Sequence, residues 1–99
     1  MEDSPLEFHP EAEEEYLSAL RWYRDRSLPA AVKFENAFRQ AIEKINHSPE
    51  RWPVYFARFR KYRLRQFPFS IVYRCDSSRT FVLAVAHGRR RPGYWKRRV

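Results

Sequence analysis

Cysteine and glycine are scarce in this sequence, and long apolar runs are missing from it. Cys75 is the only cysteine, so no disulfide can form within the chain, which suits a reducing cytoplasm. Gly88 and Gly93 are the only glycines, and neither belongs to a phosphate-cradling glycine loop. No stretch approaches the roughly 18 apolar residues that a membrane span needs, and the acidic N-terminus lacks the apolar run of a signal peptide. We therefore expect a cytoplasmic protein that does not enter a membrane.

Clusters of metal-binding or catalytic side chains are also missing. One cysteine and three scattered histidines provide no metal-ligand spacing, so the sequence predicts neither a metal site nor another cofactor. Paired carboxylates and a serine–histidine–acid combination are not visible either. His9 and His47 fall at expected helix boundaries, and the glutamates between Glu11 and Glu15 are interpreted as charge that favours a helix start.

Acidic residues are nearly absent from the second half of the chain. Residues 1–50 carry 11 acidic and 6 basic side chains, whereas residues 51–99 carry one acid, Asp76, and 14 basic side chains. The halves therefore have net charges of −5 and +13, within an overall charge of +8. This segregation predicts an anionic partner for the C-terminal half, either a polyanion or an acidic protein. A basic surface that serves solubility alone is the alternative, although solubility does not require the two signs to be separated.

The residues that are present predict one α+β domain over residues 1–99, with the element order β-α-α-β-β-β. Pro10 and the glutamates after it begin a helix over about residues 10–26, in which apolar side chains recur every three or four residues. Ser27 caps a second helix that ends at residues 46–49. A connection of a few residues separates the two helices, so we expect an antiparallel helical hairpin.

Alternating side chains predict strands on both sides of this hairpin. Residues 5–8 form a brief first strand, and the alternation from Phe59 to Arg65 indicates a half-exposed strand on which Arg63 and Arg65 share a face. Residues 67–74 and 80–87 alternate most clearly, with a hairpin turn at residues 76–79. Short turns favour a mostly antiparallel sheet with the helices on one face. Trp52, in the loop before these strands, is interpreted as an anchor against the core in preference to a ligand platform.

A dense block of basic and aromatic residues follows the last strand, from His87 to Arg98. Guanidinium groups bind phosphates, and aromatic rings stack on unpaired bases, which is a stronger interpretation than a frayed basic tail. His87 could be a general acid or base, or a partly buried strand residue bonded to a backbone carbonyl. If the basic strand face continues into the block, a basic groove results. The candidate contacts to nucleic acid or another target are Arg60, Lys61, Arg63, Arg65, Arg74, Arg90, Arg91 and Trp95.

Five segments of this chain together resemble one known family. They are FHPEA near the start, WYRDRS at the end of the first helix, SPERWP after the second, FPFSIVY in a strand and AVAHGRRRPGYW at the end. In this order they resemble the RelE/ParE toxin superfamily of type II toxin–antitoxin modules, whose members are also named plasmid stabilisation proteins. The resemblance implies a growth-arresting toxin that an antitoxin, encoded beside it, wraps with an extended or helical, often acidic, segment. A heterotetramer is one assembly that the resemblance allows.

The resemblance implies one of two activities. RelE-like members cut messenger RNA in the ribosomal A site without a metal, and ParE-like members poison DNA gyrase. For the first activity the catalytic positions are Arg89, Tyr94 and, one or two residues out of step, His87. RelE-like chains carry an arginine before the apolar-Val-Tyr of the central strand, where this chain has Ser70. Without that arginine a large electrostatic stabilisation of the phosphate is lost, so the ParE-like branch is favoured.

Two rivals to the ParE-like interpretation stay open. The first is the metal-independent messenger-RNA endonuclease, in which another arginine of the strands replaces the missing one. The second is a small basic RNA-binding domain without toxicity, which would bind RNA in a salt-sensitive manner.

Overall fold

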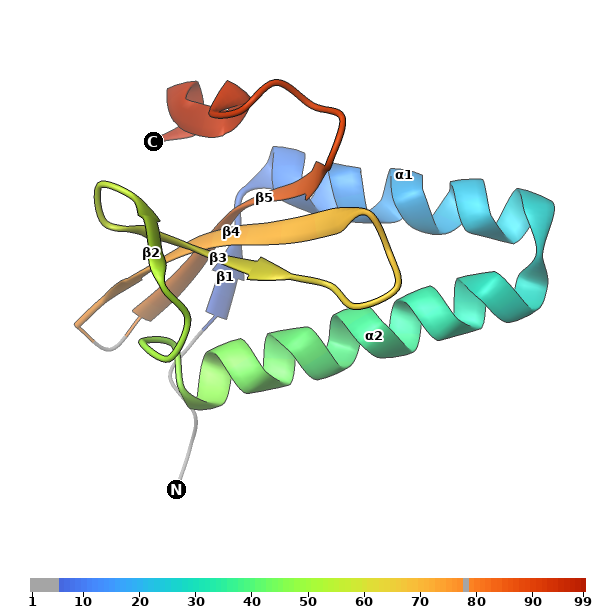
Figure 1. The fold of residues 1–99 in the computed structure, drawn as a ribbon, viewed down its shortest axis with the longest axis horizontal. Helices are drawn as coiled ribbons and strands as arrows, with labels where there is room; N and C mark the ends of the chain where they lie inside the picture. Colours follow the sequence, from blue (N-terminus) through green and yellow to red (C-terminus); the bar gives the residue numbers. More distant parts are fainter. Residues whose placement is uncertain (1–5, 78) are drawn as a thin grey trace.

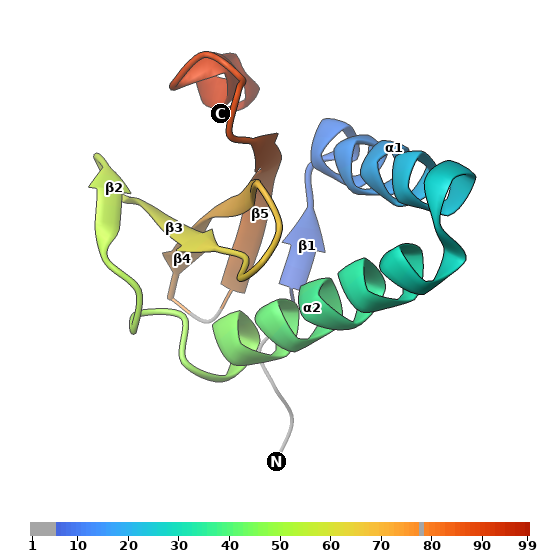
Figure 2. The same ribbon diagram turned by 45° about the vertical axis from the view of Figure 1, so that its right-hand side comes forward.

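Two helices pack on one face of a five-stranded sheet (Figures 1 and 2) in the computed structural model, which describes residues 6–77 and 79–99. The elements in chain order are β1 (Leu6–Phe8), α1 (Pro10–Arg26), α2 (Leu28–His47), β2 (Val54–Phe56), β3 (Phe59–Arg63), β4 (Phe69–Asp76), β5 (Arg79–His87) and the 3-10 helix η1 (Tyr94–Arg98). This order confirms the predicted fold class and adds two short elements, β2 and η1, that the sequence pattern did not predict. Pro5 of the first predicted strand and Ser78 of the predicted turn lie outside the described residues.

One residue connects the two helices. The backbone N–H of Ser27 donates to the carbonyl of Tyr23 at 2.7 Å and closes α1, while its Oγ accepts from the N–H of Ala30 at 3.3 Å and caps α2. The predicted connection of a few residues is therefore wrong, because a single extended serine caps both helices. No helix within residues 6–77 and 79–99 combines the length and the apolar character that crossing a membrane requires.

The strand order is β1-β5-β4-β3-β2, with β1 parallel to β5 and every other neighbouring pair antiparallel. The sheet is thus mostly antiparallel, as predicted. β3 ends at Arg63, and Gln66 then adopts a positive φ of 70°, so Arg65 lies in the connecting loop. The prediction that Arg63 and Arg65 share a strand face is therefore wrong.

Both faces of the sheet are covered. The helix-facing core contains large side chains of α2 packed against β4 and β5: Phe34, Phe38, Ile45, Ile71, Tyr73, Val82 and Val85. On the opposite face, Trp95 of η1 closes a smaller core with Phe59, Val72, Leu83 and Ala84. Because β4 and β5 are buried on both faces, their central residues are apolar on both sides of the alternation. Within the C-terminal block, residues 87–98, η1 is therefore a structural cover of this face and not a free tail.

Candidate functional site

The C-terminal block is fastened to α1 by a network around the Glu15 carboxylate. Its Oε2 accepts a hydrogen bond from the Tyr94 hydroxyl at 2.7 Å and one from Arg98 at 2.7 Å, and its Oε1 accepts a second from Arg98 at 3.1 Å. The side chain of Arg98 is 3% exposed and that of Glu15 is 16% exposed. A bidentate contact between a guanidinium and a carboxylate is stronger than a neutral hydrogen bond. The network holds η1 in a defined position beside the sheet.

Glu15 and Arg98 also complete an open edge of β5. β1 pairs with β5 only from Thr80 to Val82, so the next part of that edge has no neighbouring strand. There the N–H of Val85 donates to Glu15 Oε1 at 2.9 Å, and Arg98 donates to the Leu83 carbonyl at 2.9 Å. Buried backbone groups need partners, and here a carboxylate and a guanidinium supply them.

Hydrogen bonding determines the charge states in this network. Burial by itself raises the pKa of Glu15, but the bonds from Arg98, Tyr94 and the Val85 amide outweigh it and hold that pKa below its usual value. Burial, together with the bond to the Glu15 carboxylate, raises the pKa of Tyr94. At neutral pH Glu15 is therefore anionic, and Tyr94 is a neutral donor whose proton is committed to Glu15.

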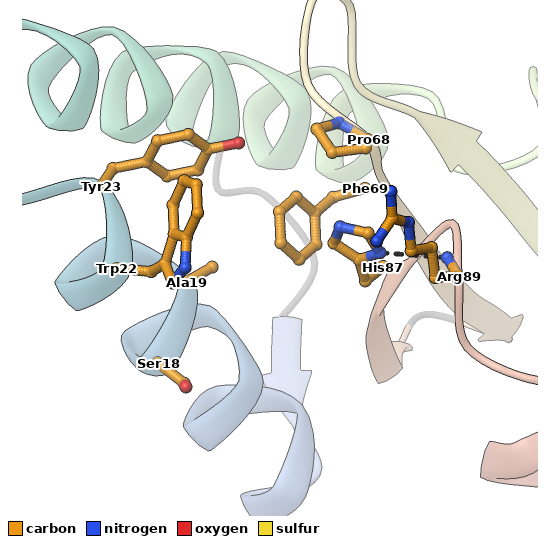
Figure 3. A pocket seen from close by; sticks show the side chains of 8 residues that line it. All are labelled: Ser18, Ala19, Trp22, Tyr23, Pro68, Phe69, His87 and Arg89. Atoms are coloured by element: carbon orange, nitrogen blue, oxygen red, sulfur yellow. Dashed lines mark hydrogen bonds between the residues drawn. The ribbon is translucent and has the colours of Figure 1, made fainter. Parts of the chain in front are cut away.

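An apolar cavity of about 390 Å³ lies between α1 and the ends of β4 and β5 (Figure 3). Trp22, which is 52% exposed, forms one wall, and Phe69 and His87 face it from the sheet. The remaining lining residues are Ser18, Ala19, Tyr23, Pro68 and Arg89. We call this feature the helix-side cavity. Its apolar walls with one guanidinium at the rim suit an apolar side chain of a partner protein.

His87 is held at the border of this cavity. Its Nδ1 accepts a hydrogen bond from the backbone N–H of Arg89 at 3.0 Å, and its ring lies edge-on to Phe69 with the centroids 5.0 Å apart. This matches a partly buried strand residue, although the partner of the ring is a backbone amide and not the carbonyl considered from the sequence.

A smaller cavity of about 110 Å³ opens on the other face of the sheet, between β3, β4 and the C-terminal block. Lys61, Arg90 and Arg91 line it, Ser70 is part of the lining on β4, and none of its described lining residues is acidic. We call it the outer cavity. Arg90 stacks on the ring of Tyr94 at 3.8 Å and approaches Glu15 Oε2 at 3.9 Å. The outer cavity is basic, but it is not the predicted groove, because Arg63 and Arg65 line a separate hollow and Arg89 lines the helix-side cavity.

The three catalytic candidates do not gather around one cavity. Arg89 lines the helix-side cavity, Tyr94 lines the outer cavity, and His87 lies between the two and lines both. A reacting phosphate that touched Tyr94 in the outer cavity would have Ser70, and not an arginine, at the β4 position. The outer cavity brings His87 and Tyr94 together with Arg90 and Arg91, which can hold an anion, but Arg89, the arginine that the resemblance assigns to catalysis, lines the helix-side cavity instead.

Several predicted contact residues are engaged within the protein. Trp95 is 2% exposed, so its predicted role as a stacking surface for a target is wrong: its ring fills the outer core. Arg60 donates to the carbonyls of Glu50 and Trp52, at 3.2 and 2.6 Å, and so holds the loop before β2. Trp52 itself packs on Tyr62 with the ring centroids 4.8 Å apart, as an anchor would.

The remaining arginines of the strand region differ in whether they are engaged within the protein. Arg74 pairs with Asp76 at 2.7 Å and lies over the ring of Phe81, so it is not free to bind a target without giving up these contacts. Arg63 and Arg65 are exposed and line a shallow hollow along residues 63–68.

Within the described residues, no three His, Cys, Asp or Glu side chains gather as a metal ion would need.

Sequence reasoning missed Arg98 and assigned Glu15 to helix-start charge. One signal was available for Glu15: it lies three residues after Ala12 and four before Ala19, on the buried face of α1. A carboxylate on an apolar stripe requires a partner in the tertiary structure. Nothing in the sequence distinguishes Arg98 from the arginines around it, since only the fold brings it to Glu15.

Comparison with known proteins places this architecture. A model of the family described as ParE toxin of type II toxin-antitoxin system, parDE, matches residues 6–92. Toxin ParE2 of Mycobacterium tuberculosis, from strains CDC 1551 / Oshkosh and H37Rv, is 28% identical over 88 residues, which are 88% of this chain and 84% of that toxin. The solved structure of the chromosomal ParDE TA system from P. aeruginosa has a TM-score of 0.72 at 16% identity, covering 85% of this chain and 95% of the other. At that identity the structural likeness concerns the fold.

Proposed function

Because the chain belongs to the ParE toxin family of type II toxin–antitoxin systems, we propose that it arrests bacterial growth by poisoning DNA gyrase. A type II toxin acts on an essential cellular component when its antitoxin is removed. The open question for this chain is the target, for which the superfamily offers the ribosome with its messenger RNA or the gyrase.

The observation that carries the choice of gyrase is the state of Tyr94. Its hydroxyl donates to Glu15 at 2.7 Å and its pKa is raised, so it is a poor acid or base for RNA cleavage. Ser70 stands at the β4 position where a RelE-like chain carries an arginine, so the positive charge of the outer cavity comes only from Lys61, Arg90 and Arg91 around it. Arg89 lines the helix-side cavity and Tyr94 lines the outer cavity, so the two side chains do not share one cavity. These features favour a toxin that works by binding a protein.

We propose that the antitoxin occupies the helix-side cavity. The chain carries +13 on residues 51–99, which favours an acidic partner, and Arg89 offers a cation beside the apolar walls. An amphipathic antitoxin segment would place an apolar side chain between Trp22 and Phe69 and a carboxylate near Arg89. Toxin and antitoxin would then assemble in the cytoplasm, and we expect a heterotetramer, which light scattering on the co-purified complex would check.

Induced expression of the wild-type chain in a test bacterium would test this function. We expect growth arrest with DNA breaks and SOS induction, no codon-phased new 5′ ends in messenger RNA, and inhibition of supercoiling by purified gyrase. The variant Arg89→Ala should keep this activity, because Arg89 has no catalytic task in the proposal. Cleaved messages with undamaged DNA, abolished by Arg89→Ala, would show instead that the chain is an RNA endonuclease.

A further inference from the structure

The free edge of the sheet carries a row of exposed apolar side chains. β2 is the edge strand, and Val54, Tyr55 and Phe56 are 53%, 41% and 42% exposed, respectively. An edge strand presents unpaired backbone groups, which natural proteins shield with charge, a bulge or a cover; β2 is only three residues long, and its register with β3 shifts between Val54 and Phe56, but its side chains have no cover. Three consecutive exposed apolar residues at such an edge suit a partner that covers the side chains and pairs with the backbone.

Two lysines are fixed over the aromatic rings of this strand. Lys61 Nζ lies 4.4 Å from the ring centroid of Tyr55, and Lys96 Nζ lies 3.8 Å from that of Phe56. Neither lysine forms an ion pair with a carboxylate of residues 6–77 and 79–99. We call Val54, Tyr55, Phe56, Lys61 and Lys96 the β2-edge patch. It combines apolar area with two ammonium groups that have no anionic partner within the described chain.

The patch is continuous with the outer cavity. A hollow of about 190 Å³ between β2 and the C-terminal block is lined by Phe56, Lys96 and three residues that also line the outer cavity: Tyr55, Pro92 and Gly93. The two hollows thus share a wall and follow one path, from the aromatic rings of β2 to Arg90 and Arg91. The Glu15–Arg98–Tyr94 network, which anchors η1, keeps one side of this path in place.

The geometry distinguishes between the anionic partners that could use this path. A nucleic-acid base needs a free aromatic face for stacking, but Lys96 covers one face of Phe56, and Phe59 stacks parallel to it with the ring centroids 6.4 Å apart. A second copy of this chain would bring patches with lysines of the same sign together, in a protein of net charge +8. Carboxylates, in contrast, can pair with both ammonium groups while their neighbours cover the rings.

We propose that the β2-edge patch docks an extended, acidic segment of the toxin's protein target, which adds to the sheet beside β2. Carboxylates of that segment pair with Lys61 and Lys96, and its apolar side chains cover Tyr55 and Phe56. This inference rests on the proposed function, in that the target is a protein. The patch lies on the β2 side of the sheet, away from the α1 wall of the helix-side cavity (Figure 2), so the two surfaces can be altered separately.

The test uses two patch variants, Phe56→Glu and Lys96→Glu, and two controls on the helices. Phe56→Glu places a charge on the apolar part, and Lys96→Glu reverses a cation whose side chain is exposed. Trp22→Glu alters the helix-side cavity, and Lys33→Glu makes the same charge change as Lys96→Glu at an exposed position of α2. Growth arrest, co-purification with the neighbouring antitoxin, and binding to purified gyrase subunits are measured for each, with circular dichroism and immunoblots to verify folding and expression.

We expect both patch variants to lose growth arrest while they still co-purify with the antitoxin. Their affinity for gyrase should fall at least about 10-fold, which is the effect of truncating a central interface residue. Trp22→Glu should stay toxic and escape the antitoxin, and Lys33→Glu should behave as wild type. Folded patch variants that remain fully toxic would refute the inference and leave the proposed function intact. Patch variants that stay toxic but no longer bind the antitoxin would assign the patch to the antitoxin, which also refutes it.

Failure of the proposed function has a different signature. Growth arrest by the wild-type chain without gyrase binding would refute the gyrase proposal. The inference about the β2-edge patch would then be supported by loss of growth arrest in the patch variants and refuted by its retention. Competition of single-stranded RNA for the patch, abolished by Lys96→Glu, would show that the occupant is a nucleic acid. A wild-type chain that does not arrest growth would contradict both.

Discussion

Replacing Glu15 by glutamine tests whether its carboxylate holds the C-terminal block in place. The substitution keeps the shape of the side chain but removes the negative charge opposite Arg98, whose side chain is only 3% exposed. Breaking a buried ion pair by removing one partner costs about 3–5 kcal/mol. Glu15 keeps some solvent contact, so we expect Glu15→Gln to lower the free energy of unfolding by about 2–3 kcal/mol. For a domain of this size that corresponds to a midpoint about 10–20 °C lower.

Urea and thermal denaturation followed by circular dichroism measure this change, and Glu14→Gln is the matched control. Glu14 pairs with Arg21 at 3.1 Å, but both side chains are more than half exposed, so its loss should cost less than about 1 kcal/mol. A double-mutant cycle with Arg98→Met isolates the coupling between the two partners. If Glu15→Gln is no more destabilising than Glu14→Gln, the network does not hold the C-terminal block in place.

The same network makes the free energy of unfolding depend on pH in the acid range. The native carboxyl of Glu15 has a lower pKa than the unfolded one, whose ordinary value is 4.5, so the unfolded chain binds this proton more readily. The contribution of Glu15 is therefore complete above about pH 4.5 and is lost as the pH falls through the native pKa. Glu15→Gln should flatten this part of the stability curve, and an unchanged acid dependence would contradict the assignment.

Three further outcomes follow from single contacts. Tyr94→Phe removes one hydrogen bond to Glu15 and should cost about 1–2 kcal/mol in urea denaturation while growth arrest persists; loss of arrest in a folded protein would favour a catalytic Tyr94. Trp95→Ala empties the outer core and should cost about 3–5 kcal/mol, and a smaller loss would mean that η1 is not a necessary cover. Arg60→Met leaves two carbonyls of the loop before β2 without their donor and should lower the free energy of unfolding by about 1–2 kcal/mol. It should also speed cleavage near Trp52, which limited proteolysis with a protease other than trypsin, followed by mass spectrometry, would detect.

The helices and the charge distribution follow from local features of the chain. Pro10 at a helix start, Ser27 as a cap and apolar residues at helical spacing specify α1 and α2, because these signals act over three or four residues. The clear alternation of β4 and β5 similarly predicted two paired strands. β2 was missed because three residues between Pro53 and a turn at Ala57 are too short to show a period, and the strand exists only beside β3.

The candidate site was predicted in composition but not in arrangement. Residue types alone indicated a basic, aromatic C-terminal block, and Arg90 and Arg91 of that block line the outer cavity together with Lys61 of β3. Which residues of the block face a partner depends on the sheet: Trp95 turns inward to cover an otherwise bare face. No local signal could separate Trp95 from an exposed stacking ring.

The sequence by itself determined the two helices, the segregation of charge and the resemblance to one toxin superfamily, since each is visible in neighbouring residues or in the chain order. Only the tertiary structure decided that β1 lies parallel beside β5, and that Glu15 meets Arg98 across 83 positions. It also decided that β2 forms an exposed edge with lysines over its rings. These features depend on contacts between distant segments, and a long-range contact is specified by the packing of the whole core and not by the residues that make it.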